Sequence, residues 1–254
     1  MATAVVMALA ISGCGRGADA GAGAGVESRI TVLAAASLTD AFSDVATAFE
    51  AANPGLTVEV NPGASSSLRE QILAGAPGDV FAPADNANMA AVVKAGAAVD
   101  PADFVANELQ IVVPAGNPAG VTGLADFADA DLLLGLCAEE VPCGQFARRV
   151  LATAGVTPGG LAPAIDTNEP DVRSLLTKVE AGELDAGIVY RTDVLAAGDA
   201  VEGIDVPADA NVAVTYAIAA LTGAANPEGA AAFVAFVLSD EGQAILASFG
   251  FRTP

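Results

Sequence analysis

Three hydroxyl side chains and four expected helix starts supply hydrogen-bond donors without positive charge. The hydroxyls belong to Ser37, Ser65 and Tyr190, and the helix starts lie at Ser37, at Ser65 or Ser66, after Cys143 and at Val172. The first N–H groups of a helix have no partner inside the helix, and the helix dipole adds partial positive charge there. Such donors, brought to one point, would bind a small anion without lysine or arginine.

The clearest of these helix starts follows the apolar run 32–36. The run is typical of a buried strand, and Ser37 is then expected to open a helix. Ser37 and Asp40 have the spacing of a capping box, with Asp in place of the usual Glu or Gln. The same order of strand, small-residue turn, serine and helix is repeated around Ser65 and Ser66.

Strand and helix signals alternate along the rest of the chain. The expected strands are 30–35, 56–60, 79–83, 109–114, 131–137, 185–190 and 211–221. The expected helices are 38–52, 66–74, 86–95, 145–154, one from near 168–171 to 182, 227–238 and 240–249. This alternation predicts parallel strands covered by helices on both faces. Two such blocks predict two lobes, with a ligand cleft between them at the carboxyl ends of the strands.

The composition excludes several classes of function. The chain has 254 residues and is 53% apolar, enough for one large core or two smaller ones. Its net charge of −21, with 10 Lys plus Arg, excludes a basic surface for nucleic acid. It has no histidine, so Ser-His-Asp catalysis, Cys-His catalysis and histidine-ligated metal sites are excluded. Pairs of Asp or Glu remain available for acid–base catalysis.

The first residues have the character of an export signal followed by an anchor. Residues 1–13 are apolar, rich in small side chains and too short to span a membrane, as in the core of a signal peptide. Ile11-Ser12-Gly13-Cys14 resembles the lipobox of bacterial lipoproteins, which implies a lipid on Cys14. The rest of 14–28 is mostly Gly and Ala and is expected to be a flexible tether. A disordered apolar tail with an unmodified cysteine is the alternative.

The other two cysteines, Cys137 and Cys143, flank the short sequence Ala-Glu-Glu-Val-Pro. An exported chain meets an oxidising environment, so we expect a disulfide between them. Two buried thiols are the alternative. No base accompanies either cysteine, so a nucleophilic role is not expected.

Each of these features also has a purely structural interpretation. A serine at a helix start is usually only a cap, and a tyrosine after an apolar strand usually packs in the core. Arg173 is expected in a surface ion pair and Asp79 in a turn. Only the joint arrangement of the donors favours a ligand site.

Seven short motifs occur in order along the chain. They are Ala34-Ala35-Ala36-Ser37-Leu38, Gly63-Ala64-Ser65-Ser66, Gln71-Ile72-x-x-Gly75-Ala76-Pro77-x-Asp79-Val80-Phe81, Val141-Pro142-x-Gly144, Asp171-Val172-Arg173, Gly187-Ile188-Val189-Tyr190 and Glu241-Gly242-Gln243-Ala244-Ile245. Together they resemble the molybdate-binding proteins of bacterial ABC importers, over residues 29–252.

The resemblance implies an α/β fold of two lobes, the type II periplasmic-binding-protein fold, with mainly parallel sheets flanked by helices. One lobe would comprise 29–108 and 218–254, and the other 109–217. The oxyanion would lie in the cleft and accept hydrogen bonds from the hydroxyls and amides of Ser37 and Ser65, the backbone N–H groups of Cys143 and Val172, and the hydroxyl of Tyr190. Such proteins typically have a small residue in place of Cys143, where only the amide matters.

The expected function is therefore extracytoplasmic binding of molybdate, and of tungstate, for delivery to the permease and ATPase of an ABC importer. We expect a lipid-anchored or periplasmic monomer that is not an enzyme, has no cofactor and holds molybdenum only through its oxygens. Sulfate is smaller than molybdate, so its oxygens would not reach all of the donors. Phosphate carries a proton near neutral pH, and a cleft that contains only donors has no acceptor for the hydrogen bond from that proton.

Three other functions remain open at this point. The first is a binding protein for another oxyanion such as sulfate or phosphate, or for ferric iron. Iron sites in similar folds use clustered tyrosines, whereas this chain has only Tyr190 and Tyr216. The second is an enzyme that uses a pair of carboxylates, and the third is a structural lipoprotein without a cleft.

Overall fold

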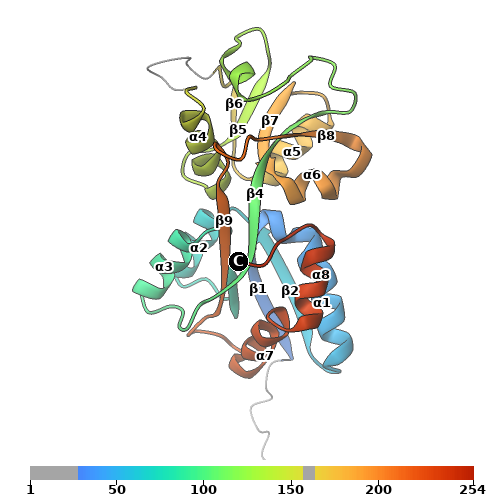
Figure 1. Cartoon of the computed structure of the whole chain (residues 1–254). Helices are drawn as coiled ribbons and strands as arrows, with labels where there is room; N and C mark the ends of the chain where they lie inside the picture. The colour runs from blue at the N-terminus through green and yellow to red at the C-terminus, as the bar shows by residue number, and fades with distance from the viewer. Residues whose placement is uncertain (1–27, 157–163) are drawn as a thin grey trace, which may run out of the picture.

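The computed structural model describes residues 28–156 and 164–254. The expected signal segment, Cys14 and the tether up to residue 27 lie outside the described residues. Figure 1 shows two halves, one above the other, joined by two long strands, β4 (Ala102–Pro114) and β9 (Ala213–Ala220).

The lower half in Figure 1 contains the first strands and both ends of the described chain. Its other strands are β1 (Arg29–Ala35), β2 (Thr57–Gly63) and β3 (Val80–Ala82). Its helices are α1 (Thr39–Ala52), α2 (Ser65–Leu73), α3 (Asn86–Lys94), α7 (Pro227–Val237) and α8 (Asp240–Ser248). The apolar face of α1 buries Phe42 and Phe49 against Phe233 of α7, at ring-centroid distances of 6.1 and 5.3 Å. These edge-on aromatic contacts attach the C-terminal helices to the N-terminal block.

The upper half contains β5 (Leu134–Cys137), β6 (Thr167–Glu169), β7 (Ala186–Tyr190) and β8 (Val201–Asp205). Its helices are α4 (Pro142–Thr153), α5 (Val172–Glu180) and α6 (Arg191–Ala197). Short 3-10 turns complete the described chain at η1 (Ala36–Leu38), η2 (Leu124–Ala128) and η3 (Gly198–Ala200). The upper and lower halves thus repeat the arrangement of strands packed against helices.

The strands form one continuous path in the order β2-β1-β3-β9-β4-β7-β5-β6, with β8 paired to β4. The outer pairs β1–β2, β1–β3, β5–β6 and β5–β7 are parallel, as predicted. The pairings that join them, β3–β9, β4–β9, β4–β7 and β4–β8, are antiparallel. The expectation of mainly parallel sheets therefore holds for the two outer blocks and not for the centre of the sheet.

Strand β4 belongs to both halves. Residues 102–108 pair with β9, whereas residues 109–114 pair with β7 and β8. The predicted lobe boundaries at 108/109 and 217/218 therefore fall inside β4 and β9.

Several predicted element boundaries were wrong. The strand expected at 109–114 begins at Ala102, and the strand expected from 131 begins at Leu134. The helix expected from 145 begins at Pro142, because proline fits the first turn of a helix, where its missing N–H is not needed. For the next helix the sequence indicated a start near 168–171 or at Val172, and the helix begins at Val172, because residues 167–169 pair with β5 as a strand. Helix α6 and strand β8 were not expected at all.

Within the described ranges, no single helix is long and apolar enough to cross a membrane. Helices α7 and α8 meet the length and composition test only as a pair, and the pair is bent by 62°.

Candidate functional site

A small cavity lies where the two halves meet. It is lined by residues of both halves, which are Ala35, Ala36, Ser37, Gly63, Ala64, Ser65, Ala84, Val141, Pro142, Cys143, Asp171, Val172 and Tyr190. The volume of this cavity is about 20 Å³, which admits a water molecule or a small ion. A tetrahedral oxyanion has this size, whereas a sugar or a peptide is larger. All five residues predicted to bind a ligand are in this lining.

Four helical N-termini converge on the cavity, two from each half. They are the turn η1 that leads into α1, and the starts of α2, α4 and α5. Each follows a strand, and these strands form the parallel pairs β1–β2 and β5–β6. Because parallel neighbours end at the same edge of a sheet, their following helices start side by side. The N–H groups and dipoles of these helices together favour a bound anion.

Tyr190 presents an unpaired hydroxyl at this cavity. The residue is the last of β7 and is 1% exposed. Among residues 28–156 and 164–254, its hydroxyl oxygen is buried and has no hydrogen-bond partner. Burial raises the pKa of the Tyr190 phenol, so the group stays protonated and is a donor at any physiological pH. A buried hydroxyl without a partner is costly in a native structure, and a bound acceptor in the cavity would satisfy it.

The Ser65 hydroxyl is prepared to donate. Ser65 is the first residue of α2 and is 1% exposed. Its oxygen accepts the Ala84 N–H at 2.9 Å. Because a hydroxyl has a single proton, this contact leaves the Ser65 proton available to an acceptor in the cavity.

The predicted capping box at Ser37 is wrong. Ser37 lies in η1, and the N-cap position of α1 is Leu38, without a side-chain cap. The Ser37 hydroxyl is instead 3.0 Å from the hydroxyl of Tyr216 on β9. The Asp40 carboxylate forms an ion pair with Arg173 of α5. Partners from distant parts of the chain have replaced the local cap.

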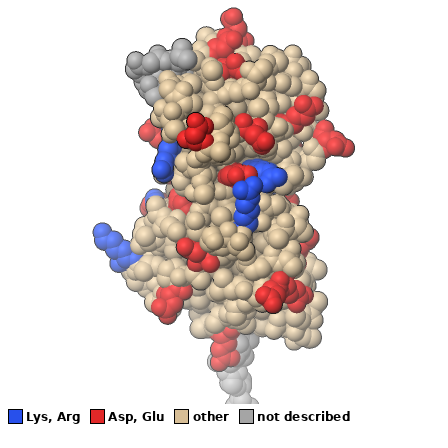
Figure 2. All heavy atoms as spheres, in the orientation of Figure 1, with Lys and Arg blue, Asp and Glu red and all other residues tan. Residues whose placement is uncertain are grey.

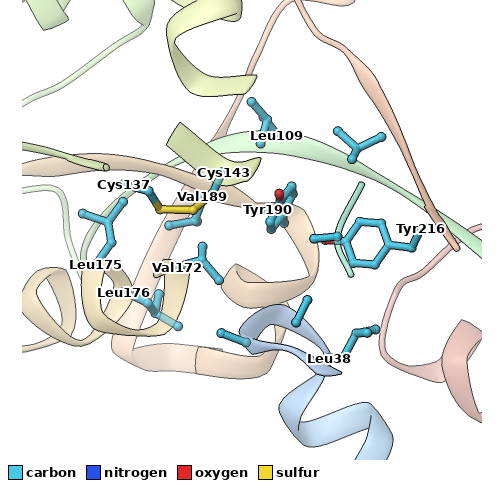
Figure 3. Packing of buried hydrophobic residues seen from close by; sticks show 14 of the residues in the cluster. Leu38, Leu109, Cys137, Cys143, Val172, Leu175, Leu176, Val189, Tyr190 and Tyr216 are labelled. Carbon is cyan, nitrogen blue, oxygen red and sulfur yellow. A yellow bond between two sulfur atoms is a disulfide. The ribbon is translucent and has the colours of Figure 1, made fainter. Parts of the chain in front are cut away.

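Cys143 lies in the first turn of α4, and its sulfur forms a disulfide with Cys137 at the end of β5 (Figure 3). Arg148 reinforces the same turn, since its Nη1 donates to the carbonyl oxygens of Cys137 and Gly144 at 2.8 and 3.1 Å. The strand end and the helix start are thus tied together by one covalent bond and two hydrogen bonds. Cys143, which lines the cavity, is held in place as a result.

Removing this disulfide should lower both stability and anion affinity. For the Cys137→Ser/Cys143→Ser variant we expect a loss of about 2 kcal/mol in unfolding free energy, because the bond closes a short loop. Thermal unfolding measures this loss as a decrease of about 4–8 °C in melting temperature. Titration calorimetry with molybdate should show several-fold weaker binding. An unchanged melting temperature under oxidising conditions would contradict the expectation.

No positively charged side chain is among the residues that line the cavity in the described part of the chain. Arg173 follows Val172 but pairs with Asp40 of the opposite half, with the two side chains 30% and 46% exposed. This agrees with the surface ion pair expected for Arg173, and such a pair contributes about 1 kcal/mol or less. Figure 2 shows acidic side chains over both halves, and several of the few basic ones near the level where the halves meet.

The carboxylates of Asp171 and Asp79 have structural roles. The Asp171 carboxylate caps α5 by accepting the backbone N–H and the hydroxyl of Ser174, at 2.9 and 3.2 Å. Asp79 accepts the N–H groups of Thr31 and Asn226 at 2.7 and 3.0 Å and does not line the cavity. Among the described residues no group of three or more His, Cys, Asp or Glu side chains is placed to hold a metal ion.

Two buried groups behind the site were missed from the sequence. One is Tyr216. The other is Asp193, which is 2% exposed and accepts the Tyr190 N–H at 3.1 Å. Burial raises the pKa of Asp193 to about 7, against the opposing effect of Arg173. The spacing of Tyr190 and Asp193 is that of a helix N-cap and its third residue, a signal that could have located Asp193.

Residues 30–252 match the model of a protein family described as bacterial extracellular solute-binding protein. This chain belongs to that family. One relative is the molybdate-binding protein ModA of Mycobacterium tuberculosis, which is 40% identical over 226 residues. The match covers 89% of this chain and 85% of the relative. The family consists of binding proteins of transport systems, in agreement with the expectation of a binding protein.

Two solved structures of solute-binding proteins have a fold similar to that of this chain. The periplasmic molybdate-binding protein of Azotobacter vinelandii has a TM-score of 0.77 at 20% identity, over 89% of this chain and 99% of that one. The sulfate-binding protein SubI of M. tuberculosis has a TM-score of 0.76 at 21% identity, over 89% and 86%. The predicted α/β periplasmic-binding-protein fold is confirmed. Because the two proteins are named for different oxyanions, the fold alone does not choose the anion.

Proposed function

We propose that this protein binds molybdate, and tungstate, outside the cytoplasm and delivers it to the permease of an ABC transporter. The family of extracellular solute-binding proteins supports the location, and the relative named for molybdate supports the ligand. The cavity supports a small oxyanion of either kind. Among the described residues, its lining has donors of hydrogen bonds and no positively charged side chain, and the Asp171 carboxylate in the lining caps its own helix.

The observation that carries this proposal is the buried, unpaired hydroxyl of Tyr190 facing a cavity that the helix starts surround. We propose that the anion accepts a hydrogen bond from this hydroxyl. It would accept further hydrogen bonds from the hydroxyls and amides of Ser37 and Ser65, and from the backbone N–H groups of Cys143 and Val172. Each hydrogen bond to a charged ligand contributes about 1.5–3 kcal/mol. Several of them offset the cost of removing a dianion from water.

The donor set favours an anion without a proton. Molybdate and tungstate are fully deprotonated near neutral pH, whereas phosphate keeps a proton that requires an acceptor. The one carboxylate in the cavity lining, Asp171, is engaged with its own helix. Sulfate lacks a proton as well but is smaller, so fewer of its oxygens would reach donors on both halves.

The arrangement of the halves suggests how the ligand enters and leaves. We propose lobes of 29–108 with 218–254 and of 109–217, which move relative to each other by bending β4 and β9. A lipid on Cys14 would anchor the protein at the outer face of the membrane, and the residues before the first strand would act as a tether. The proposed working unit is a monomer that meets the permease and its ATPase.

Titration calorimetry on the full chain tests the function. Molybdate and tungstate should give heats of binding at micromolar concentration, and sulfate and phosphate should bind at least about 100-fold more weakly. Ferric iron as its citrate complex should give no heat. Strong binding of sulfate, phosphate or iron together with no heat from molybdate would refute the proposal.

Ser65→Ala tests the ligand set. The variant loses a hydroxyl that lines the cavity, so the Kd for molybdate should rise about 10- to 150-fold. Ser66→Ala is the matched control, because Ser66 is the next residue of α2, is also buried and does not line the cavity. The control should bind molybdate like the unmodified protein. Equal effects of the two substitutions would remove Ser65 from the proposed site.

A further inference from the structure

The side chain behind Ser37 is Tyr216, which lies outside the cavity lining. Tyr216 is on β9, is 0% exposed and has its hydroxyl 3.0 Å from the Ser37 oxygen. Its ring packs edge-on against Tyr190, with the centroids 5.8 Å apart, and Figure 3 shows the two rings side by side. The hydroxyl of Tyr216 is thus within hydrogen-bond distance of a residue that lines the cavity, Ser37, although Tyr216 itself does not line it.

A second hydrogen bond favours the Tyr216 hydroxyl as the donor of this pair. The Nδ2 of Asn107 donates to the Tyr216 hydroxyl at 3.5 Å and to the Thr192 hydroxyl at 2.9 Å. The Oδ1 of Asn107 accepts the N–H of Glu108 at 3.0 Å, which fixes the orientation of the amide. Because Asn107 supplies a donor, the Tyr216 oxygen accepts there and has its own proton left for Ser37.

The direction of this chain of hydrogen bonds has a consequence for the anion. If Tyr216 donates to the Ser37 oxygen, the Ser37 proton must point elsewhere, and the cavity is the open direction. Burial raises the pKa of the Tyr216 phenol, so Tyr216 stays protonated and has a proton to donate at physiological pH. The Ser37 hydroxyl then faces the cavity as a donor, like the Ser65 hydroxyl, whose oxygen is occupied by Ala84.

We propose that Tyr216 is a positioning residue for anion binding, which orients the Ser37 hydroxyl as a donor and so disfavours protonated anions. This rests on the proposed function of the site. The chain runs from Thr192 on α6 through Asn107 on β4 and Tyr216 on β9 to Ser37 on η1. It therefore crosses from the upper half to the lower half through both connecting strands. Hydrogen-bonded chains of this kind strengthen each member in a buried environment.

Tyr216→Phe tests the positioning role. The variant removes one hydroxyl and keeps the ring that packs against Phe104, Tyr190 and Phe251. We expect the Kd for molybdate to rise about 5- to 30-fold, since one charge-assisted donor is no longer oriented. The Kd for phosphate should stay equal or fall, because a freely rotating Ser37 hydroxyl can also accept. The ratio of the two affinities is a readout that a loss of packing alone would not change.

Double variants show whether Tyr216 acts through Ser37. In the Ser37→Ala background, Tyr216→Phe should have little further effect on the Kd for molybdate. In the Ser65→Ala background it should have its full effect, because Ser65 is oriented by Ala84 and not by Tyr216. Additivity within about 0.5 kcal/mol is the norm for independent sites, so the contrast is measurable.

The outcomes separate this inference from the proposed function. If the unmodified chain does not bind molybdate, the proposed function fails. If the unmodified chain binds molybdate, the proposed function stands. The positioning role is then refuted if Tyr216→Phe has the same Kd for molybdate as the unmodified chain, or if its effect on the Kd adds fully to that of Ser37→Ala. Should Tyr216→Phe not fold, Asn107→Asp serves instead, because a carboxylate would accept the Tyr216 proton and turn it away from Ser37. That variant should bind molybdate at least 5-fold more weakly, and unchanged affinity would refute the role.

Discussion

Gly144→Ala should abolish tight anion binding, with at least a 100-fold rise in the Kd for molybdate. A methyl group at this position would lie 1.9 Å from the carbonyl oxygen of Ala138 and 2.5 Å from that of Cys137. Both are backbone atoms of the turn that the disulfide closes, so neither can move aside alone. The start of α4 must shift away, and the Cys143 N–H would leave the cavity. The loss in unfolding free energy should be about 3 kcal/mol or more.

Gly223→Ala is the matched control for this prediction. A methyl group at Gly223 would meet no atom within 4 Å, so stability and affinity should be unchanged. Thermal unfolding and titration calorimetry on the two variants give both comparisons. Normal affinity in Gly144→Ala would show that the first turn of α4 contributes nothing to the site.

Asp193→Asn should stabilise the protein above neutral pH. The pKa of Asp193 is about 7 in the folded chain, chiefly because of burial, and about 3.9 in an unfolded one. A carboxyl group with a raised folded pKa contributes its full stability below about pH 4, and this is lost as the pH rises to about 7. Above that value a buried carboxylate destabilises the native state. Asparagine stays neutral, and its oxygen can still accept the Tyr190 N–H.

We expect a gain of about 2–4 kcal/mol in unfolding free energy for Asp193→Asn at pH 8, and almost none at about pH 3.5. The groups that act on Asp193 are Arg173, the Tyr190 N–H and Asp171, and all of them remain in the variant. Burial also raises the pKa of Asp85, so the stability of the variant should still depend in part on pH. Urea unfolding at the two pH values measures the difference. The exposed Asp44→Asn is the control and should show no such difference.

The same substitution should tighten anion binding at pH 8. The Asp193 carboxylate accepts the backbone N–H of Tyr190, whose hydroxyl faces the cavity. Because the protein interior screens charge poorly, the negative charge of Asp193 should repel a bound anion. Calorimetry should show a lower Kd for molybdate in the variant at pH 8 than in the unmodified protein. Equal affinities at pH 8 and pH 5 for both proteins would place Asp193 outside the electrostatics of the site.

Local patterns in the sequence located most of the site. Ser65 and Val172, two of the expected helix starts, begin helices in the structure, and Tyr190 ends its strand. These features depend on neighbours within a few positions, which is the range that periodicity and turn residues report. Strand β4 shows the limit, because its first half was not recognised and its pairing with β9 joins positions more than 100 apart.

The sequence by itself determined the chemistry of the site, which consists of neutral donors at helix starts in a chain without histidine. That followed from residue types, which need no partner to be identified. Only the tertiary structure decided which way each donor faces. Ser37 bonds Tyr216, 179 positions away, instead of capping its own helix, and Asp193 became a buried acid beneath Tyr190. Such contacts arise when strands and helices distant in sequence pack together, and no local pattern records them.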